Sequence, residues 1–215
     1  MIDLSKYSHI IWDWNGTLLN DALLCVDVMN ELLIERNLPV KTLQEYRTLF
    51  DFPVKDYYLK LGFDFDKEPF EIVGMEFMAH YNRRQKESTL HPEVFKVLES
   101  FAEKGFRQCI LSAREQNELI AETRAYGVYS FFDHIYGLDD HYAHGKNGAG
   151  IMLMETLGIS RDKILFIGDT RHDAEVAAEI GISCILIPNG HHSLERLAQC
   201  QVPISPSLTE LIRLV

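Results

Sequence analysis

The sequence predicts an α/β fold, a doubly wound (Rossmann-like) and mostly parallel sheet with an inserted all-helical segment. Short apolar runs alternate with helical patterns over residues 92–215, which is typical of a parallel sheet covered by helices. Residues 20–88 show helical patterns only. Three apolar runs end in a reactive or metal-binding side chain, namely Asp13, Ser112 and Asp169. Because parallel strands share a C-terminal edge, we expect these side chains at the edge where open α/β sheets bind ligands.

Composition and charge narrow the class of protein. The 215 residues, 47% hydrophobic and 25% charged, allow one large domain or a domain with a smaller insertion. The formal net charge of −11 argues against nucleic acid and anionic membranes as partners. No apolar run approaches the roughly 20 residues that span a bilayer, and the N-terminus lacks a signal-peptide layout. With four scattered cysteines and no Cys-x-x-Cys pair, we expect reduced thiols in a cytoplasmic protein. Separately, we expect a monomer or weak homodimer.

The first predicted strand, residues 8–13, delivers Asp13 at its C-terminal end, because Gly16 and Thr17 break the apolar run. Helices are then predicted over residues 21–37, from Thr42 with Glu45 as a capping box, over 54–61 and over 68–86, with a loop at 50–53. We therefore expect residues 20–88 to form a helical cap domain, with short connections near 17–20 and 87–91. Residues 1–19 and 89–215 would form the core domain.

The second half of the chain supplies the remaining strands and helices. They are predicted as helix 92–104, strand 106–111 closing on Ser112, helix 115–126, strand 134–137, helix 148–157, strand 163–167, helix 173–180, strand 182–187 and helix 208–214.

Four short segments carry the candidate chemistry. They are Asp13-Trp14-Asn15-Gly16-Thr17, Ser112 in Ile-Leu-Ser-Ala-Arg, Lys146 ahead of a helix, and Gly168-Asp169-Thr170-Arg171-His172-Asp173. Together they resemble motifs I to IV of the haloacid dehalogenase superfamily, whose members are mostly phosphatases. The resemblance covers the whole chain, is greatest to phosphoglycolate-phosphatase-like members, and implies that residues 20–88 are the family's helical cap.

The chemistry of phosphoryl transfer suits these residue types. Asp13 would attack phosphorus and form an aspartyl phosphate. Mg²⁺ prefers oxygen ligands, so Asp13, Asp169 and the backbone carbonyl of Asn15 would hold it. Asp173 would orient either a metal-bound water or Lys146. Ser112, Lys146 and Thr17 would hold the transferring phosphoryl group.

The substrate would be a small phosphorylated metabolite, a phosphomonoester similar to phosphoglycolate. Ser112, Ala113, Arg114 and Lys146 are candidates for binding it, and Lys55 in the cap loop would meet a second anionic group. A solvated surface lysine is the alternative interpretation of Lys55. The sequence does not name the substrate.

Asn15 departs from the family pattern. The family has an aspartate there that protonates the leaving alcohol and then activates water, and an amide can do neither. Loss of a general acid–base costs about 10²–10⁴ in rate. Two interpretations follow: a phosphatase with another acid or a good leaving group, and a slow or non-catalytic phosphate-binding protein. A phospho-accepting receiver domain is disfavoured by the helical insertion.

Several residues also have ordinary structural interpretations. Asp169 and Asp173 alone could be acidic residues at a helix N-terminus. The pair His191-His192 is predicted to lie in a solvated loop, with His192 in the pocket as the alternative. Trp12 and Trp14 are predicted to pack in the core.

Overall fold

The computed structural model describes residues 3–138 and 146–214, and it confirms the predicted fold class. A five-stranded parallel sheet has the order β5–β4–β1–β6–β7. Its strands are β1 (His9–Trp12), β4 (Arg107–Glu115), β5 (His134–Leu138), β6 (Ile164–Gly168) and β7 (Ser183–Leu186). The central strand β1 is apolar on both faces. Ile10 and Ile11 point to opposite sides and are both fully buried, which contributes about 1.5–3 kcal/mol each.

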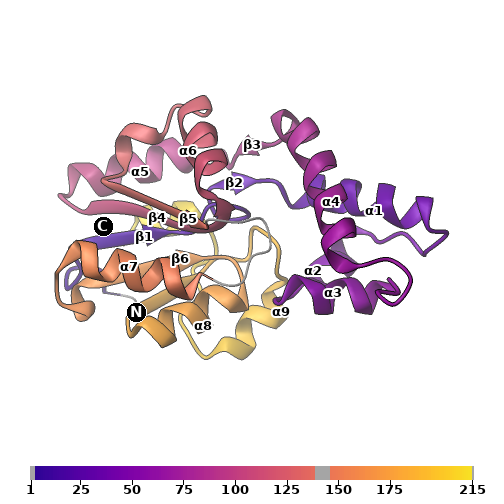
Figure 1. The fold of residues 1–215 in the computed structure, drawn as a ribbon. Coiled ribbons are helices and arrows are strands. Elements are labelled where there is room, and N and C mark those ends of the chain that lie inside the picture. Colours follow the sequence, from indigo (N-terminus) through magenta and orange to yellow (C-terminus); the bar gives the residue numbers. More distant parts are fainter. Residues whose placement is uncertain (1–2, 139–145, 215) are drawn as a thin grey trace.

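Helices cover both faces of the sheet (Figure 1). On one face lie α5 (Val94–Glu103), α6 (Gln116–Ala125) and α10 (Leu208–Ile212), and on the other lie α7 (Asn147–Leu157) and α8 (Arg171–Ile180). Trp12 and Trp14 are fully buried in the apolar core between the sheet and the layer of α5, α6 and α10, as predicted. Short helical segments are α9 (Leu194–Leu197) and the 3₁₀ turns Gln85–Glu87, Tyr129–Phe131, Arg161–Lys163 and Ala198–Cys200.

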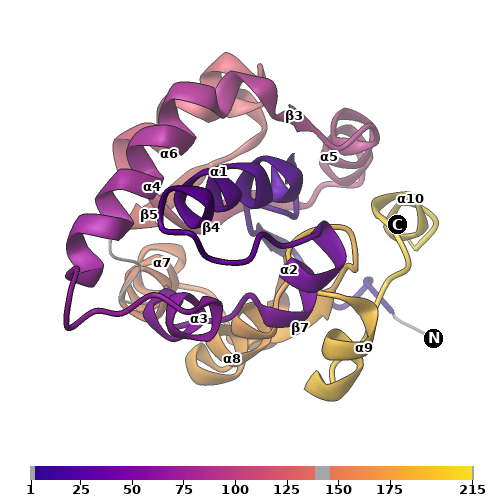
Figure 2. The same ribbon diagram turned by 90° about the vertical axis from the view of Figure 1, so that its right-hand side faces the viewer.

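The helices α1 (Ala22–Glu35), α2 (Leu43–Leu49), α3 (Val54–Leu61) and α4 (Phe70–Arg84) gather at one end of the sheet (Figure 1). Viewed from that end, α1 lies among the other three (Figure 2). They pack around an apolar cluster of their own, which includes Leu32, Tyr58 and Val73. The predicted capping box of Thr42 and Glu45 is present at the start of α2.

The two connections to these helices lie side by side. Leu19–Asn20 (β2) pairs antiparallel with Thr89–Leu90 (β3), with Leu19 opposite Leu90 and Asn20 opposite Thr89. Neither strand was predicted, because two residues are too few to show an alternating pattern. Entry into and exit from the helical segment therefore form a single narrow ribbon.

Strand β4 differs from its predicted extent. It does not close on Ser112 but continues to Glu115, and its register with β5 shifts between Leu111 and Glu115. The apolar pattern ends at Leu111, so the sequence showed the end of the apolar run and not the end of the strand. No helix in the part of the chain that the structure describes is long and apolar enough to cross a membrane.

Candidate active site

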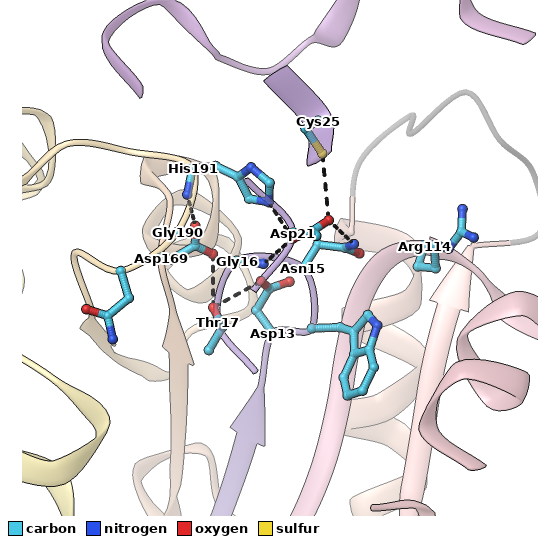
Figure 3. Close-up of polar contacts among 12 residues, drawn as sticks. Asp13, Asn15, Gly16, Thr17, Asp21, Cys25, Arg114, Asp169, Gly190 and His191 are labelled. Atoms are coloured by element: carbon cyan, nitrogen blue, oxygen red, sulfur yellow. Dashed lines mark hydrogen bonds and ion pairs between the residues drawn. The ribbon is translucent and has the colours of Figure 1, made fainter. Parts of the chain in front are cut away.

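Three polar side chains lie where β1, β4 and β6 approach their C-terminal ends. Asp13 follows β1, Ser112 lies in β4 and Asp169 follows β6, and each is at most 4% exposed. The hydroxyl of Thr17 lies 3.1 Å from Oδ2 of Asp13 and 2.9 Å from Oδ1 of Asp169 (Figure 3). The structure therefore brings the predicted nucleophile and the predicted metal ligand of β6 together around one hydroxyl group.

Asp169 is held tightly by backbone that approaches it closely. Gly16 has φ +80°, and a Cβ there would lie 2.4 Å from Oδ2 of Asp169. A Cβ at Gly190 would lie 2.1 Å from the same oxygen. That oxygen accepts a hydrogen bond from the backbone N–H of His191 at 2.6 Å (Figure 3). These two positions require glycine because any side chain would collide with the carboxylate.

Lys146 occupies the N-cap position of α7 and reaches into the carboxylate cluster. Its Nζ contacts Oδ1 of Asp13 and lies 2.6 Å from Oδ1 of Asp173. The other oxygen of Asp173 accepts hydrogen bonds from the N–H groups of Asp169 and Thr170 and from the Thr170 hydroxyl. Of the two roles predicted for Asp173, these contacts favour the orientation of Lys146.

The carboxylate cluster fits a hard divalent cation. Oxygen atoms of Asp13, Asp169 and Asp173 lie within 4.8 Å of one another, and all three residues are buried. Burial raises the pKa of Asp13 well above its usual range. Lys146 opposes this shift, while Asp173 and Asp169 add to it. Three carboxylates and one ammonium leave an excess of negative charge, and the donors are all oxygen, as Mg²⁺ prefers.

Asn15 is fixed by its neighbours. Its amide Nδ2 donates to Oδ2 of Asp21 at 2.8 Å and lies 3.1 Å from the hydroxyl of Tyr81. Tyr81 also donates to Oδ2 of Asp21, and Oδ1 of Asp21 accepts from the backbone N–H of Gly16. Asp21 is the N-cap residue of α1, but its side chain makes no capping hydrogen bond.

The prediction of a solvated histidine pair was wrong. His191 is 5% exposed and His192 is fully buried, because the loop after β7 folds over the site. The ring of His191 lies 3.3 Å from Asp21 through Nε2 and 2.8 Å from the Tyr46 hydroxyl through Nδ1. His192 accepts a hydrogen bond from the backbone N–H of Arg171 instead.

The two histidine pKa values are shifted in opposite directions. Burial lowers the pKa of His191, but the charge and hydrogen bond of Asp21 outweigh burial and raise it to about 9. Burial lowers the pKa of His192 to about 3, with Arg196 adding to the effect. At neutral pH one imidazole is therefore charged and its sequence neighbour is neutral. The signal that could have found His191 is its position just after the last strand, at the edge that carries Asp13.

Two of the cations predicted to bind substrate, Arg114 and Lys55, contact other residues of the protein. The guanidinium of Arg114 lies 2.7 Å from Glu122 and 2.8 Å from Glu118, and it donates to Asn82. Lys55 is exposed, and its ammonium lies 5.7 Å and 5.9 Å from the ring centres of Phe65 and Phe70. The structure does not bring Lys55 into the cavity of the site.

A cavity of about 180 Å³ opens above these groups. Its floor is polar and includes Asp13, Asn15, Ser112, Ala113, Arg114 and Lys146. Its opposite wall comes from α1–α4 and the loop before α3, and is mainly aromatic and aliphatic. Tyr57 in this wall is 1% exposed, and its hydroxyl has no hydrogen-bond partner among the described residues.

The chain is similar to known proteins in sequence and in fold. The model of the haloacid dehalogenase-like hydrolases matches residues 10–187. The phosphoglycolate phosphatase of Rhodobacter capsulatus is 22% identical over 186 residues, which cover 85% of this chain and 84% of the relative. The pyrophosphatase PpaX of Halalkalibacterium halodurans is 22% identical over 195 residues, covering 85% and 84%. A haloacid dehalogenase-like hydrolase structure from Streptococcus pneumoniae gives a TM-score of 0.84 at 21% identity, covering 97% and 98%.

Proposed function

The chain belongs to the haloacid dehalogenase-like hydrolases, and we propose that it is a Mg²⁺-dependent phosphatase acting on a small phosphomonoester through an aspartyl phosphate on Asp13. That it is a phosphatase of this family agrees with its relatives, which include phosphoglycolate phosphatases and a pyrophosphatase. The metal, the nucleophile and the substrate are our proposal.

One observation carries the proposal. The carboxylate of Asp13 lies at the floor of the cavity, in contact with Lys146 and bridged to Asp169 through the Thr17 hydroxyl. A nucleophilic carboxylate needs positive charge beside it to approach a phosphate dianion. Asp13 and Asp169 would hold Mg²⁺, together with the backbone carbonyl of Asn15. The metal would supply positive charge and polarise the phosphoryl oxygens.

The proposed reaction has two steps, and different residues act in them. A carboxylate oxygen of Asp13 forms a bond to phosphorus while the bond from phosphorus to the leaving oxygen breaks, and the leaving alkoxide takes a proton from water to depart as the alcohol. Water then attacks the phosphorus of the aspartyl phosphate, which releases inorganic phosphate and restores Asp13. Lys146 and Ser112 hold the transferring oxygens, and Asp173 keeps Lys146 in place.

Residues 20–88 would act as a lid over this reaction. Their helices pack around a separate apolar cluster and enter and leave through the β2–β3 ribbon. The lid side also contacts the core through polar groups, including Tyr46 with His191 and Arg47 with the backbone carbonyl of Gly190. Lids of this kind close over substrate and exclude water.

The fixed amide of Asn15 favours a second candidate, a protein that binds phosphorylated ligands and turns them over slowly. An amide cannot give a proton to a leaving alcohol, and the amide of Asn15 is held in place by its hydrogen bond to Asp21. In this interpretation the nucleophile and the cation site are present, but proton transfer limits the rate.

Phosphate release from acetyl phosphate and from a panel of phosphomonoesters tests the proposal. We expect release with Mg²⁺, none in EDTA, and none from Asp13→Asn, whose amide is no nucleophile. Asp66→Asn, which removes an exposed carboxylate elsewhere, should behave as the wild type. Turnover in EDTA or in Asp13→Asn would contradict the assignment. Calorimetric binding of inorganic phosphate without any turnover would instead support the slow-turnover candidate.

A further inference from the structure

The cations that line the cavity are all engaged by anions of the protein. Among the described residues they are Lys146, Arg114 and His191. Lys146 is shared by Asp13 and Asp173, and Arg114 by Glu118 and Glu122. His191 faces Asp21. A substrate with a second negative charge beyond its phosphate would find no unpaired cation in this part of the chain.

The wall opposite the phosphate site is apolar. Phe50, Tyr57, Tyr58, Phe70, Phe77 and Met78 line it. Apolar cavities of about 150 Å³ take up a benzene-sized molecule, and this cavity has about 180 Å³. The buried hydroxyl of Tyr57 in the same wall has no hydrogen-bond partner among the described residues.

We propose that the substrate is the phosphomonoester of an uncharged, mainly apolar alcohol of about the size of one ring, and that carboxylated phosphomonoesters such as phosphoglycolate are poor substrates. The proposal rests on the phosphatase function above and narrows its substrate class. The phosphate meets the carboxylate and lysine cluster, and the organic group fills the cavity between the polar floor and the aromatic wall.

The physical reason is the cost of unpaired charge. A carboxylate moved from water into this wall loses its hydration and gains no cation, which is strongly unfavourable. An uncharged ring gains contact area with the aromatic wall and loses little favourable hydration when it leaves water. Recognition of the organic group therefore works through shape and exclusion of charge.

Three esters of primary alcohols isolate this recognition from the chemistry of the leaving group. They are benzyl phosphate, ethyl phosphate and phosphoglycolate. With Mg²⁺ present, we expect kcat/KM for benzyl phosphate to exceed that for ethyl phosphate by about 10-fold or more. Phosphoglycolate should fall below ethyl phosphate. Calorimetry with the non-hydrolysable benzylphosphonate and phosphonoacetate should give the same order of binding.

Gly74 offers a variant that fills the cavity without disturbing the fold. It lines the cavity from α4, and a Cβ there would meet only Phe70, at 3.9 Å. Gly74→Leu also favours helix formation. We expect it to lower the benzyl-to-ethyl ratio of kcat/KM by about 10-fold. Met75→Leu, one residue along and 60% exposed, is the control that should leave the ratio unchanged.

The outcomes separate the two levels of the proposal. Hydrolysis that favours phosphoglycolate, or shows no preference for the ring, overturns the substrate class and leaves the phosphatase function intact. If neither the esters nor acetyl phosphate are hydrolysed, the phosphatase function fails, and the phosphonate affinities still decide whether the cavity selects an uncharged ring. An unchanged ratio in Gly74→Leu would show that this cavity does not hold the organic group.

Discussion

Nε2 of His191 lies 3.3 Å from Oδ1 of Asp21, and this contact joins the loop after β7 to the N-cap residue of α1. Burial alone would raise the pKa of Asp21, but the charge and hydrogen bonds of His191, Asn15 and Tyr81 lower it to about 2. The pKa of His191 is raised to about 9. The pair is therefore ionised across the neutral range and buried on both sides.

The pair should make stability depend on pH. Because the folded pKa of His191 exceeds its unfolded value of about 6.5, its contribution is complete below pH 6.5 and is lost as pH rises through about 9. The shift corresponds to stabilisation on the order of 3 kcal/mol. Urea unfolding in EDTA should show His191→Gln less stable than wild type at pH 6 and nearly equal to it at pH 10. Equal destabilisation at both pH values would show that the imidazole is uncharged.

Gly16→Ala should harm both stability and the cation site. Its new methyl group would meet the carboxylate of Asp169 at 2.4 Å, in a backbone conformation with φ +80°. Gly105→Ala is a matched control, since φ is +84° there and nothing lies within 4 Å of the new atom. We expect about 1–2 kcal/mol of destabilisation from the backbone conformation in both variants. Only Gly16→Ala should weaken Mg²⁺ binding, measured by calorimetry; equal Mg²⁺ affinity in both would contradict the close packing.

Arg114→Met should strongly destabilise the protein. The guanidinium and Glu122 are each 6% exposed on their side chains, and burial raises the pKa of Glu122 although Arg114 opposes this shift. Removing the cation alone leaves a buried carboxylate without its counterion, which costs about 3–5 kcal/mol. The double variant Arg114→Met with Glu122→Gln should recover most of that loss in urea unfolding. A single variant as stable as the wild type would show that the pair contributes nothing.

Asn15→Asp should raise the rate for esters with poor leaving groups. The new carboxyl group would lie beside Asp21. The negative charge of Asp21 would raise the pKa of the new group and keep that group protonated. A gain of about 100-fold on benzyl phosphate would correspond to about 2.7 kcal/mol. Phenyl phosphate, with a better leaving group, should gain less in the first step. If the variant is slower on benzyl phosphate, another group in the wild type supplies the proton.

The features of the fold and the site that the sequence predicted correctly are those that depend on residues close together in the sequence or on the ends of strands. The alternation of apolar runs and helices gave the sheet, and its strands placed Asp13 and Asp169 at one edge. Asp21 and His191 were missed because their role comes from a contact between positions 170 residues apart in the chain, which no local pattern reports. For Lys55, the sequence indicated a position near the cap loop but not the direction of the side chain, whose ammonium lies over Phe65 and Phe70.

The β2–β3 ribbon has a consequence for how such a protein can diversify. Residues 21–88, between β2 and β3, leave the sheet domain and return to it at adjacent points, so their removal or exchange would not require any strand of the central sheet to move. Insertions whose ends meet in this way are tolerated well by their hosts. Most of the apolar wall is encoded inside the insertion, whereas Asp13, Asp169, Asp173 and Lys146 are encoded outside it. Exchange of this insertion between relatives should therefore change the substrate range, while the residues that carry out the reaction remain those of the protein that receives it.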